Sequence, residues 1–280
     1  MPNITLKQIG AASKYLVVVA AVLVFTGWLL NTPPGLLGKA DAIAYAVCHR
    51  ISERSFHIGN FQLPLCARCS GMYLGAVTGL VFQSIIGWKR GKAPRWSIIA
   101  LLVIFVAAFG IDGVNSYLYL LKQIRPGILP QIPNIYVPNN TLRLLTGSGM
   151  GLGIAALLFP AFNQSIWTDY DDTRSGLPGW KAFGLLVGIQ ICLDLLVLTE
   201  SPVVLYPLAI IGVLGVWLLL TMVYTIVWVM ITGQDNKFMK LRQLWLPLLA
   251  GLTITVIQTY AIDMLRFWLT GTWGGFPLVK

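Results

Sequence analysis

The sequence predicts an all-α integral membrane protein, a polytopic bundle of about seven transmembrane helices with a Cys/His-rich loop between the first and second spans. Composition carries the first argument, because 56% of the residues are hydrophobic and only 11% are charged, whereas soluble domains carry about 25% charged residues. The second argument is that the apolar runs are continuous. Continuous runs suit helices, which satisfy their backbone hydrogen bonds internally, whereas barrel strands would alternate apolar and polar residues.

Seven stretches approach the roughly 20 apolar residues that a membrane-crossing helix needs. They cover approximately residues 12–30, 71–88, 96–121, 142–162, 181–199, 203–231 and 245–269. The first stretch follows two lysines, as a signal sequence would, but it has no small-residue cleavage site, so we expect a retained helix. We find no internal repeat and no soluble segment, and therefore expect residues 1–280 to form a single integral membrane domain.

The sequence between the first two spans is less uniform. The segment Asn31–Gly35 contains two prolines, which end the first span because proline lacks a backbone donor. Residues 36–47 then predict a short helix at the membrane surface. In the second span, Gly71, Gly75 and Gly79 share one helix face, which favours close approach of another helix. The alternative is that these glycines are merely tolerated.

The formal net charge of +10 is spread between the spans. It forms no basic stripe with interleaved aromatic residues, so we do not expect a nucleic-acid partner. The densest basic loop, residues 88–95, predicts a cytoplasmic position. That places the amino terminus in the cytoplasm and the Cys/His loop outside the plasma membrane. Eleven of the 20 basic residues then fall inside and nine outside, so the orientation depends mainly on this one loop.

Residues 48–75 hold three of the four cysteines and both histidines of the chain. Cys66 and Cys69 form a Cys-x-x-Cys pair, which can bring two thiolates to one ion, and a tetrahedral zinc site takes four Cys/His ligands. Cys48, His49 and His57 are the other candidate ligands. The stretch therefore predicts a metal site, with zinc as the expected ion.

The same cysteines allow two alternatives. Cys66 and Cys69 lie where the second span begins, and a helix amino terminus together with Arg68 would stabilise a thiolate for redox chemistry, with Cys48 as a partner. A structural disulfide would suit an oxidising compartment, although three cysteines leave one unpaired. The fourth cysteine, Cys192, is expected to be a small buried apolar residue.

Ionisable residues inside the spans are costly in lipid and indicate functional sites by default. Five of them fall toward the membrane face of the Cys/His loop, namely Asp112, Arg143, Asp194, Asp263 and Arg266. They predict either a shared polar cavity below that loop or ion pairs between helices, such as Asp112 with Arg143.

The chain shows a resemblance to a known family over about residues 45–155. The run CHR…ERSFH…PLCARCSGMYLG, together with Asp112-Gly113 and NNTLRLLTG at 139–147, resembles an uncharacterised family of prokaryotic multi-span membrane proteins, a domain of unknown function. The resemblance implies no activity. It implies one shared site, made of Cys48, His49, Arg50, Arg54, Ser55, Cys66, Arg68, Cys69, Gly71, Tyr73, Asp112, Asn140 and Arg143. Residues 181–269 form an additional three-helix part outside it.

We predict from these residues a zinc site over a polar intramembrane cavity, in a metal-dependent membrane enzyme that acts on a lipid-like or quinone-like substrate. If three cysteines hold the ion and water takes the open position, Asp112 could act as a base while Arg143 binds an anion. Asn140 joins them through the family pattern.

Two other functions stay open. In a membrane thiol–disulfide oxidoreductase, Cys66 and Cys69 would exchange electrons with a quinone. That arrangement is similar to the enzymes related to vitamin K epoxide reductase in its Cys-x-x-Cys at a helix start and its separate loop cysteine. In a non-catalytic subunit of a membrane complex, a closed four-ligand metal site would simply staple the loop.

Overall fold

The computed structural model describes residues 6–125 and 127–275, and within these ranges it confirms the predicted all-α bundle. Seven helices are long and apolar enough to cross a membrane. They are α1 (Leu6–Asn31), α3 (Ala67–Ile86), α4 (Trp96–Ile124), α5 (Asn140–Ile166), α6 (Trp180–Leu198), α7 (Pro202–Ile231) and α8 (Trp245–Thr270). They match the seven predicted spans, although α1 begins at Leu6 rather than near residue 12 and α3 begins at Ala67 rather than near residue 71.

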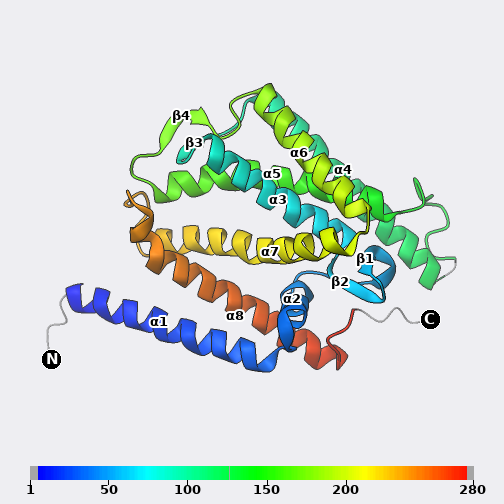
Figure 1. The fold of residues 1–280 in the computed structure, drawn as a ribbon, viewed down its shortest axis with the longest axis horizontal. Coiled ribbons are helices and arrows are strands. Elements are labelled where there is room, and N and C mark those ends of the chain that lie inside the picture. Colours follow the sequence, from blue (N-terminus) through cyan, green and yellow to red (C-terminus); the bar gives the residue numbers. More distant parts are fainter. Residues whose placement is uncertain (1–5, 126, 276–280) are drawn as a thin grey trace.

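The long helices lie side by side, with α1 and α8 along one edge of the bundle and α4 and α6 along the other (Figure 1). Between these edges lie α3, α5 and α7, and the most extensive helix–helix contact joins α3 to α5. In the spans of α3 and α5, 50% and 56% of the residues are buried, against 17% in α1 and α4. The core of the bundle is therefore the α3–α5 pair.

Glycine makes the α3–α5 contact close. A Cβ atom added at Gly71 would lie 2.1 Å from the carbonyl oxygen of Leu144, and one added at Gly75 would lie 2.5 Å from that of Ser148. From the facing side, a Cβ atom at Gly151 would lie 2.1 Å from the carbonyl oxygen of Met72. The two backbones touch directly, so the interpretation of the α3 glycines as a close-approach face is confirmed.

The two ends of the bundle carry different small elements (Figure 1). At the cysteine end lie α2 (Gly35–Tyr45), the 3-10 helix η1 (Ser52–Arg54), and an antiparallel hairpin of β1 (Ser55–Ile58) and β2 (Phe61–Cys66). At the opposite end, called the β3–β4 end, lie the parallel strands β3 (Arg90–Lys92) and β4 (Asp171–Ser175) and the 3-10 helix η2 (Leu241–Leu244).

Helix α2 confirms the short helix predicted before the Cys/His loop, but it packs into protein rather than only onto the membrane surface. Ala42, Ala44 and Tyr45 are fully buried, and α2 contacts α7 and α8. The hydroxyl of Tyr45 donates to the carbonyl oxygen of Thr272 at 2.7 Å. These contacts fix the point at which the chain enters the Cys/His loop.

The loop between α4 and α5 folds back onto α4 through Asn115. The side-chain amide of Asn115 donates to the carbonyl oxygen of Tyr136 at 3.0 Å, and its Oδ1 accepts from the backbone N–H of Ile135 at 2.9 Å. An amide that satisfies both backbone groups of an extended segment holds that segment as a neighbouring strand would. Tyr136 is thereby placed beside the cysteine end of α4.

Candidate metal centre and arginine cluster

Three cysteines converge at the cysteine end. The Sγ atoms of Cys48, Cys66 and Cys69 all lie within 4.8 Å of one another. Cys48 follows α2, Cys66 ends β2 and caps α3, and Cys69 lies in the first turn of α3. The hairpin reverses the chain after Cys48, and this reversal returns residue 66 to residue 48. The structure thus brings together the three cysteines that the sequence singles out.

Backbone donors surround the sulfur of Cys48. Its Sγ accepts from the backbone N–H of Cys66 at 3.3 Å and from that of Arg50 at 3.4 Å. Hydrogen bonds from the Cys66 and Cys69 thiols hold the pKa of Cys48 well below its ordinary value, despite its burial. The hydrogen bond to Cys48 raises the pKa of Cys66 to about 12. Of the three thiols, Cys48 is therefore the one whose thiolate its surroundings favour, which suits nucleophilic or ligand chemistry.

Two arginines hold the loop that carries Cys48. Arg266 of α8 donates through Nη1 to the carbonyl oxygens of Tyr45 and Cys48 at 2.5 and 2.6 Å, and through Nη2 to that of His49 at 3.2 Å. Arg50 has a positive φ of 53° and forms an ion pair with Asp41 at 2.7 Å. Positive φ is uncommon outside glycine and requires such support.

A serine and a glutamine connect this loop to the hairpin. Gln62 donates through Nε2 to the carbonyl oxygen of Arg50 and to Oγ of Ser55, both at 2.9 Å. Ser55 in turn donates to the carbonyl oxygen of Ile51 at 3.0 Å. The family pattern placed Arg50 and Ser55 in the site. Their contacts show that they shape the loop.

The two histidines occupy different positions. The imidazole of His49 lies beside the sulfur of Cys48, and its Nδ1 accepts from the backbone N–H of Ile51 at 3.3 Å. His57 lies on β1 at the surface, where its Nε2 shares a hydrogen bond of 3.0 Å with Oγ of Ser52. Neither ring belongs to the three-sulfur group among the described residues. His49 is the nearer candidate for a fourth ligand.

The three sulfurs fit a zinc ion. With Zn–S bonds of about 2.3 Å, two thiolates of a tetrahedral site lie about 3.8 Å apart, so sulfurs within 4.8 Å need only small rotations. The N–H groups directed at Cys48 Sγ are outer contacts of the kind that orient a metal ligand. Cys192 lies elsewhere, exposed on α6, so the expectation that it is buried was wrong.

A cluster of buried charges lies next to the cysteines, and its ion pair differs from the one suggested. Asp112 of α4 pairs with Arg68, which lies between Cys66 and Cys69 on α3, and not with Arg143. Oδ1 of Asp112 also accepts from the hydroxyl of Tyr136 at 2.7 Å. Helix α3 packs mainly against α5, and the long side chain of Arg68 reaches from α3 to Asp112 on α4.

Arg54 and Arg143 complete the arginine cluster, defined here as Arg54, Arg68 and Arg143. Arg54 donates through Nη2 to the carbonyl oxygen of Ser116 at 3.0 Å, and burial followed by the charge of Arg68 lowers its pKa. Arg143 lies within electrostatic range of both other arginines and of Cys66. The cluster and the cysteines therefore form one continuous polar region.

Asn140 ties the start of α5 to this region. Its Oδ1 accepts from Nη1 of Arg143 at 2.9 Å, and its Nδ2 donates to the carbonyl oxygen of Ser55 at 3.4 Å. One side chain thus orients Arg143 and anchors the hairpin that carries Cys66. These contacts agree with the place in the site that the family pattern implies for Asn140.

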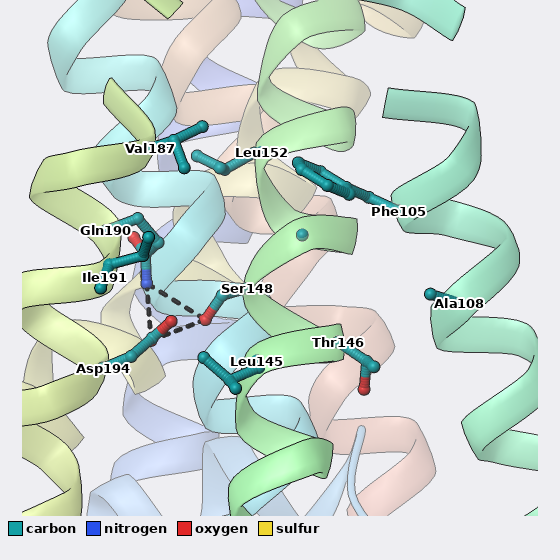
Figure 2. Close-up of a pocket in the computed structure, with 11 residues that line it drawn as sticks. Phe105, Ala108, Leu145, Thr146, Ser148, Leu152, Val187, Gln190, Ile191 and Asp194 are labelled. Carbon is teal, nitrogen blue, oxygen red and sulfur yellow. Dashed lines mark hydrogen bonds between the residues drawn. The ribbon is translucent and has the colours of Figure 1, made fainter. Parts of the chain in front are cut away.

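The other two intramembrane carboxylates lie in separate groups. Asp194 of α6 accepts from Oγ of Ser148 at 2.7 Å and from Nε2 of Gln190 at 2.9 Å, beside a pocket of about 260 Å³ between α4, α5 and α6 (Figure 2). Asp263 is fully buried on α8, within electrostatic range of Arg266. The hydrogen bonds of the described residues thus do not join Asp112, Asp194 and Asp263 into one cavity.

Sequence reasoning missed two partners of the candidate residues. Tyr136 comes from a proline-broken loop, and Gln190 from an uninterrupted apolar helix. The only available signal for Gln190 was its spacing, since a polar residue four positions before Asp194 shares its helix face. No local signal indicated Tyr136, because its place depends on the Asn115 contacts.

Three comparisons place the chain among known proteins. The family model described as Predicted membrane protein (DUF2085) matches residues 48–157. An uncharacterized protein of Methanothermobacter thermautotrophicus is 32% identical over 111 residues, which are 40% of this chain and 83% of that protein. An uncharacterized protein of Methanocaldococcus jannaschii is 25% identical over 131 residues, which are 46% and 72% of the two chains. No solved structure matches the chain. The chain belongs to this family of predicted membrane proteins (DUF2085).

Proposed function

We propose that the protein is a metal-dependent membrane enzyme. It binds zinc through Cys48, Cys66 and Cys69 and acts on a lipid-like substrate. One observation carries the proposal, which is the convergence of three sulfurs within 4.8 Å of one another. Structural zinc sites usually have four protein ligands, whereas catalytic sites have three and leave a position for water or substrate. The cysteine group has three members among the described residues, which favours the catalytic type.

The surrounding residues support catalysis in defined ways. A zinc ion bound there would supply a water of lowered pKa. His49 lies beside Cys48 and could accept a proton or act as a fourth ligand. Asp112 as a base stays a prediction, and its contacts with Arg68 and Tyr136 support the additional role of holding Arg68 in place.

Thiol redox chemistry is the second candidate, because three free thiols lie close enough to exchange a disulfide. In that case, Cys66 and Cys69 would lose two electrons and two protons to a quinone, which becomes a quinol, as their thiols form a disulfide. Cys48 and Cys66 are buried, being 4% and 3% exposed, and this burial limits the access of a quinone to their thiols. A closed four-ligand site in a non-catalytic subunit of a membrane complex is the third candidate.

The metal content of purified protein tests the proposal. We expect about one zinc ion per chain by elemental analysis. Cys66→Ser and Cys69→Ser should lose the ion, while Cys192→Ser is the matched control and should keep it, because Cys192 lies on α6 away from the group. Binding that survives His57→Ala but fails in His49→Ala would make His49 the fourth ligand.

The rivals predict different results. A redox pair would bind little metal, would ignore chelators and would show a reversible disulfide between two of the three cysteines. Metal-free protein with such a disulfide and full activity would overturn the zinc proposal. Loss of metal in both His49→Ala and Cys66→Ser without any effect on turnover would favour the non-catalytic subunit.

A further inference from the structure

We propose that Arg54, Arg68 and Arg143 bind the phosphate group of an anionic lipid, and that the apolar pocket between α4, α5 and α6 receives part of its chain. The inference rests on the proposed function and deepens it by naming the substrate class of the same site. The structure favours a lipid as the source of the phosphate, because the neighbouring pocket lies within the spans and is lined mainly by apolar side chains.

The charge balance of the arginine cluster calls for an anion. Asp112 pairs with Arg68, whereas neither Arg54 nor Arg143 has an ion-pair partner among the described residues. Arg54 and Arg143 are only 9% and 6% exposed. Glu53, next to Arg54, is exposed to solvent and compensates little. A buried charge without a partner is unfavourable, so a ligand of opposite charge would stabilise this arrangement.

Arg143 presents an unused donor inside the protein. Its Nη1 donates to Asn140 at 2.9 Å, but its Nε is buried and has no hydrogen-bond partner among the described residues. A guanidinium group offers donors in a planar fork that matches two oxygens of one phosphate. Asn140 thus fixes the orientation of Arg143 and leaves part of the fork available for a ligand.

The charge excess of the arginine cluster suits a phosphate group. Three guanidinium groups and the Asp112 carboxylate leave about two positive charges, and a thiolate at Cys48 beside the cluster lowers this excess to about one. A phosphate monoester carries about −1.5 to −2 at neutral pH, whereas a phosphodiester or a carboxylate carries only −1. The Cys66 sulfur lies within electrostatic range of Arg54 and Arg143, so the phosphate would lie next to the cysteine group.

The pocket is placed to receive an acyl or prenyl chain. Thr146, which lines it, is three residues along α5 from Arg143, and Ala108 is one turn of α4 from Asp112. Figure 2 shows these two residues on facing helices, with Ser148 farther along α5. A head group in the arginine cluster would therefore direct its chain into the groove between α4 and α6.

Lipid binding by the purified full-length protein in neutral detergent tests this inference. The probes are phosphatidic acid, phosphatidylcholine and inorganic phosphate, and the readouts are the dissociation constant and the shift in Tm. We expect phosphatidic acid to bind about tenfold more tightly than phosphatidylcholine, in keeping with charge-assisted hydrogen bonds. Arg143→Gln should remove that preference. Arg125→Gln is the matched control, because Arg125 is exposed at the same end of the bundle.

Two further variants distinguish recognition of the lipid head group from recognition of the lipid chain, and loss of binding from loss of folding. Ala108→Leu fills the pocket and should weaken phosphatidic acid without changing inorganic phosphate. Arg143→Lys keeps the charge, loses the fork and should give an intermediate preference. If Arg143→Gln does not fold, the wild-type ranking of the three probes still decides. Equal binding of both lipids, or binding of inorganic phosphate alone, would overturn the inference.

The result of the lipid-binding experiment does not depend on whether the purified protein contains zinc. Protein that prefers phosphatidic acid but holds no metal would overturn the zinc proposal and support the arginine site. Protein that holds zinc but shows no preference would do the opposite. Measuring both properties on wild type and on Cys66→Ser therefore distinguishes the two failures.

Discussion

The two ends of the bundle use charged residues in opposite ways. At the β3–β4 end, Lys89 pairs with Asp169 at 2.6 Å and Arg174 pairs with Asp171, and the acidic partners are 51% and 38% exposed. At the cysteine end, Arg54 and Arg143 are 9% and 6% exposed and lack ion-pair partners among the described residues. Exposed pairs contribute little to stability, whereas buried charges are retained for a structural or functional reason. The charged residues at the β3–β4 end are therefore ordinary surface ion pairs, whereas the buried arginines at the cysteine end belong to the candidate site.

This difference explains why charge counting orients the chain weakly. Five of the nine basic residues on the predicted outer side are Arg50, Arg54, Arg68, Arg143 and Arg266. Each makes hydrogen bonds or ion pairs inside the protein. These arginines are held by contacts inside the protein whatever side they face, so they obscure the bias that loop composition would otherwise show. The cytoplasmic position of residues 88–95 stays a prediction.

Removing one acidic residue at each end should show the contrast most strongly. Asp112→Asn leaves Arg68 buried beside no carboxylate and should lower the free energy of unfolding by about 3–5 kcal/mol. Asp169→Asn, at an exposed pair, should lower the free energy of unfolding much less, because an exposed ion pair contributes little to stability. Denaturant titration of both variants in detergent is the measurement. Equal decreases in the free energy of unfolding in the two variants would contradict the proposed difference between the two ends.

A double-mutant cycle sharpens the same contrast. Combining Asp112→Asn with Arg68→Gln should be less costly than the sum of the single changes, because the two side chains are partners. Combining Asp112→Asn with Arg143→Gln should be nearer to additive. A stronger coupling with Arg143 would contradict the pairing described here.

A smaller loss is expected where the α3–α5 contact supports the cysteine end. Gly71→Ala places a methyl group against the carbonyl oxygen of Leu144 and should cost about 1–3 kcal/mol, the usual range for overpacking. Gly110→Ala on α4 is the control, because no atom lies within 4 Å of an added Cβ there. The same unfolding assay applies, and a neutral Gly71→Ala would mean that the helices separate easily.

The smallest expected effect is a difference in pH dependence. Burial raises the pKa of Asp41 at the cysteine end, so its contribution to stability is greatest at low pH and is lost as pH rises through the folded pKa. Its hydrogen bond with Lys89 lowers the pKa of Asp169 at the other end, so that contribution is present above the unfolded value and is lost on acidification. Hydrogen exchange at each end between about pH 3 and 6 should show opposite trends, which Asp41→Asn and Asp169→Asn should separately remove.

Most of the fold was predictable because membrane spans are encoded locally. Hydropathy and length gave the seven helices, and the glycine spacing on α3 indicated its packing face. The convergence of Cys48 with Cys66 and Cys69 was also anticipated, because a short loop limits their separation. The ion-pair partner of Asp112 could not be predicted. Arg68 and Arg143 both lie toward the same membrane face as Asp112, and only the packing of the helices decides which of them pairs with it. Tyr136 and the hold of Arg266 on the loop depend likewise on contacts between distant segments.

The contact between Arg266 and the Cys48 loop links the last helix to the segment that the family model matches. Residues 48–157, the family segment, contain all three clustered cysteines and end within α5. The loop that positions Cys48 is nevertheless held from outside that segment, by a side chain of the last helix. The last helix therefore holds in place a cysteine group to which it contributes no sulfur. A chain cut after α5 would keep every sulfur of the group and lose the part that aligns the first of them.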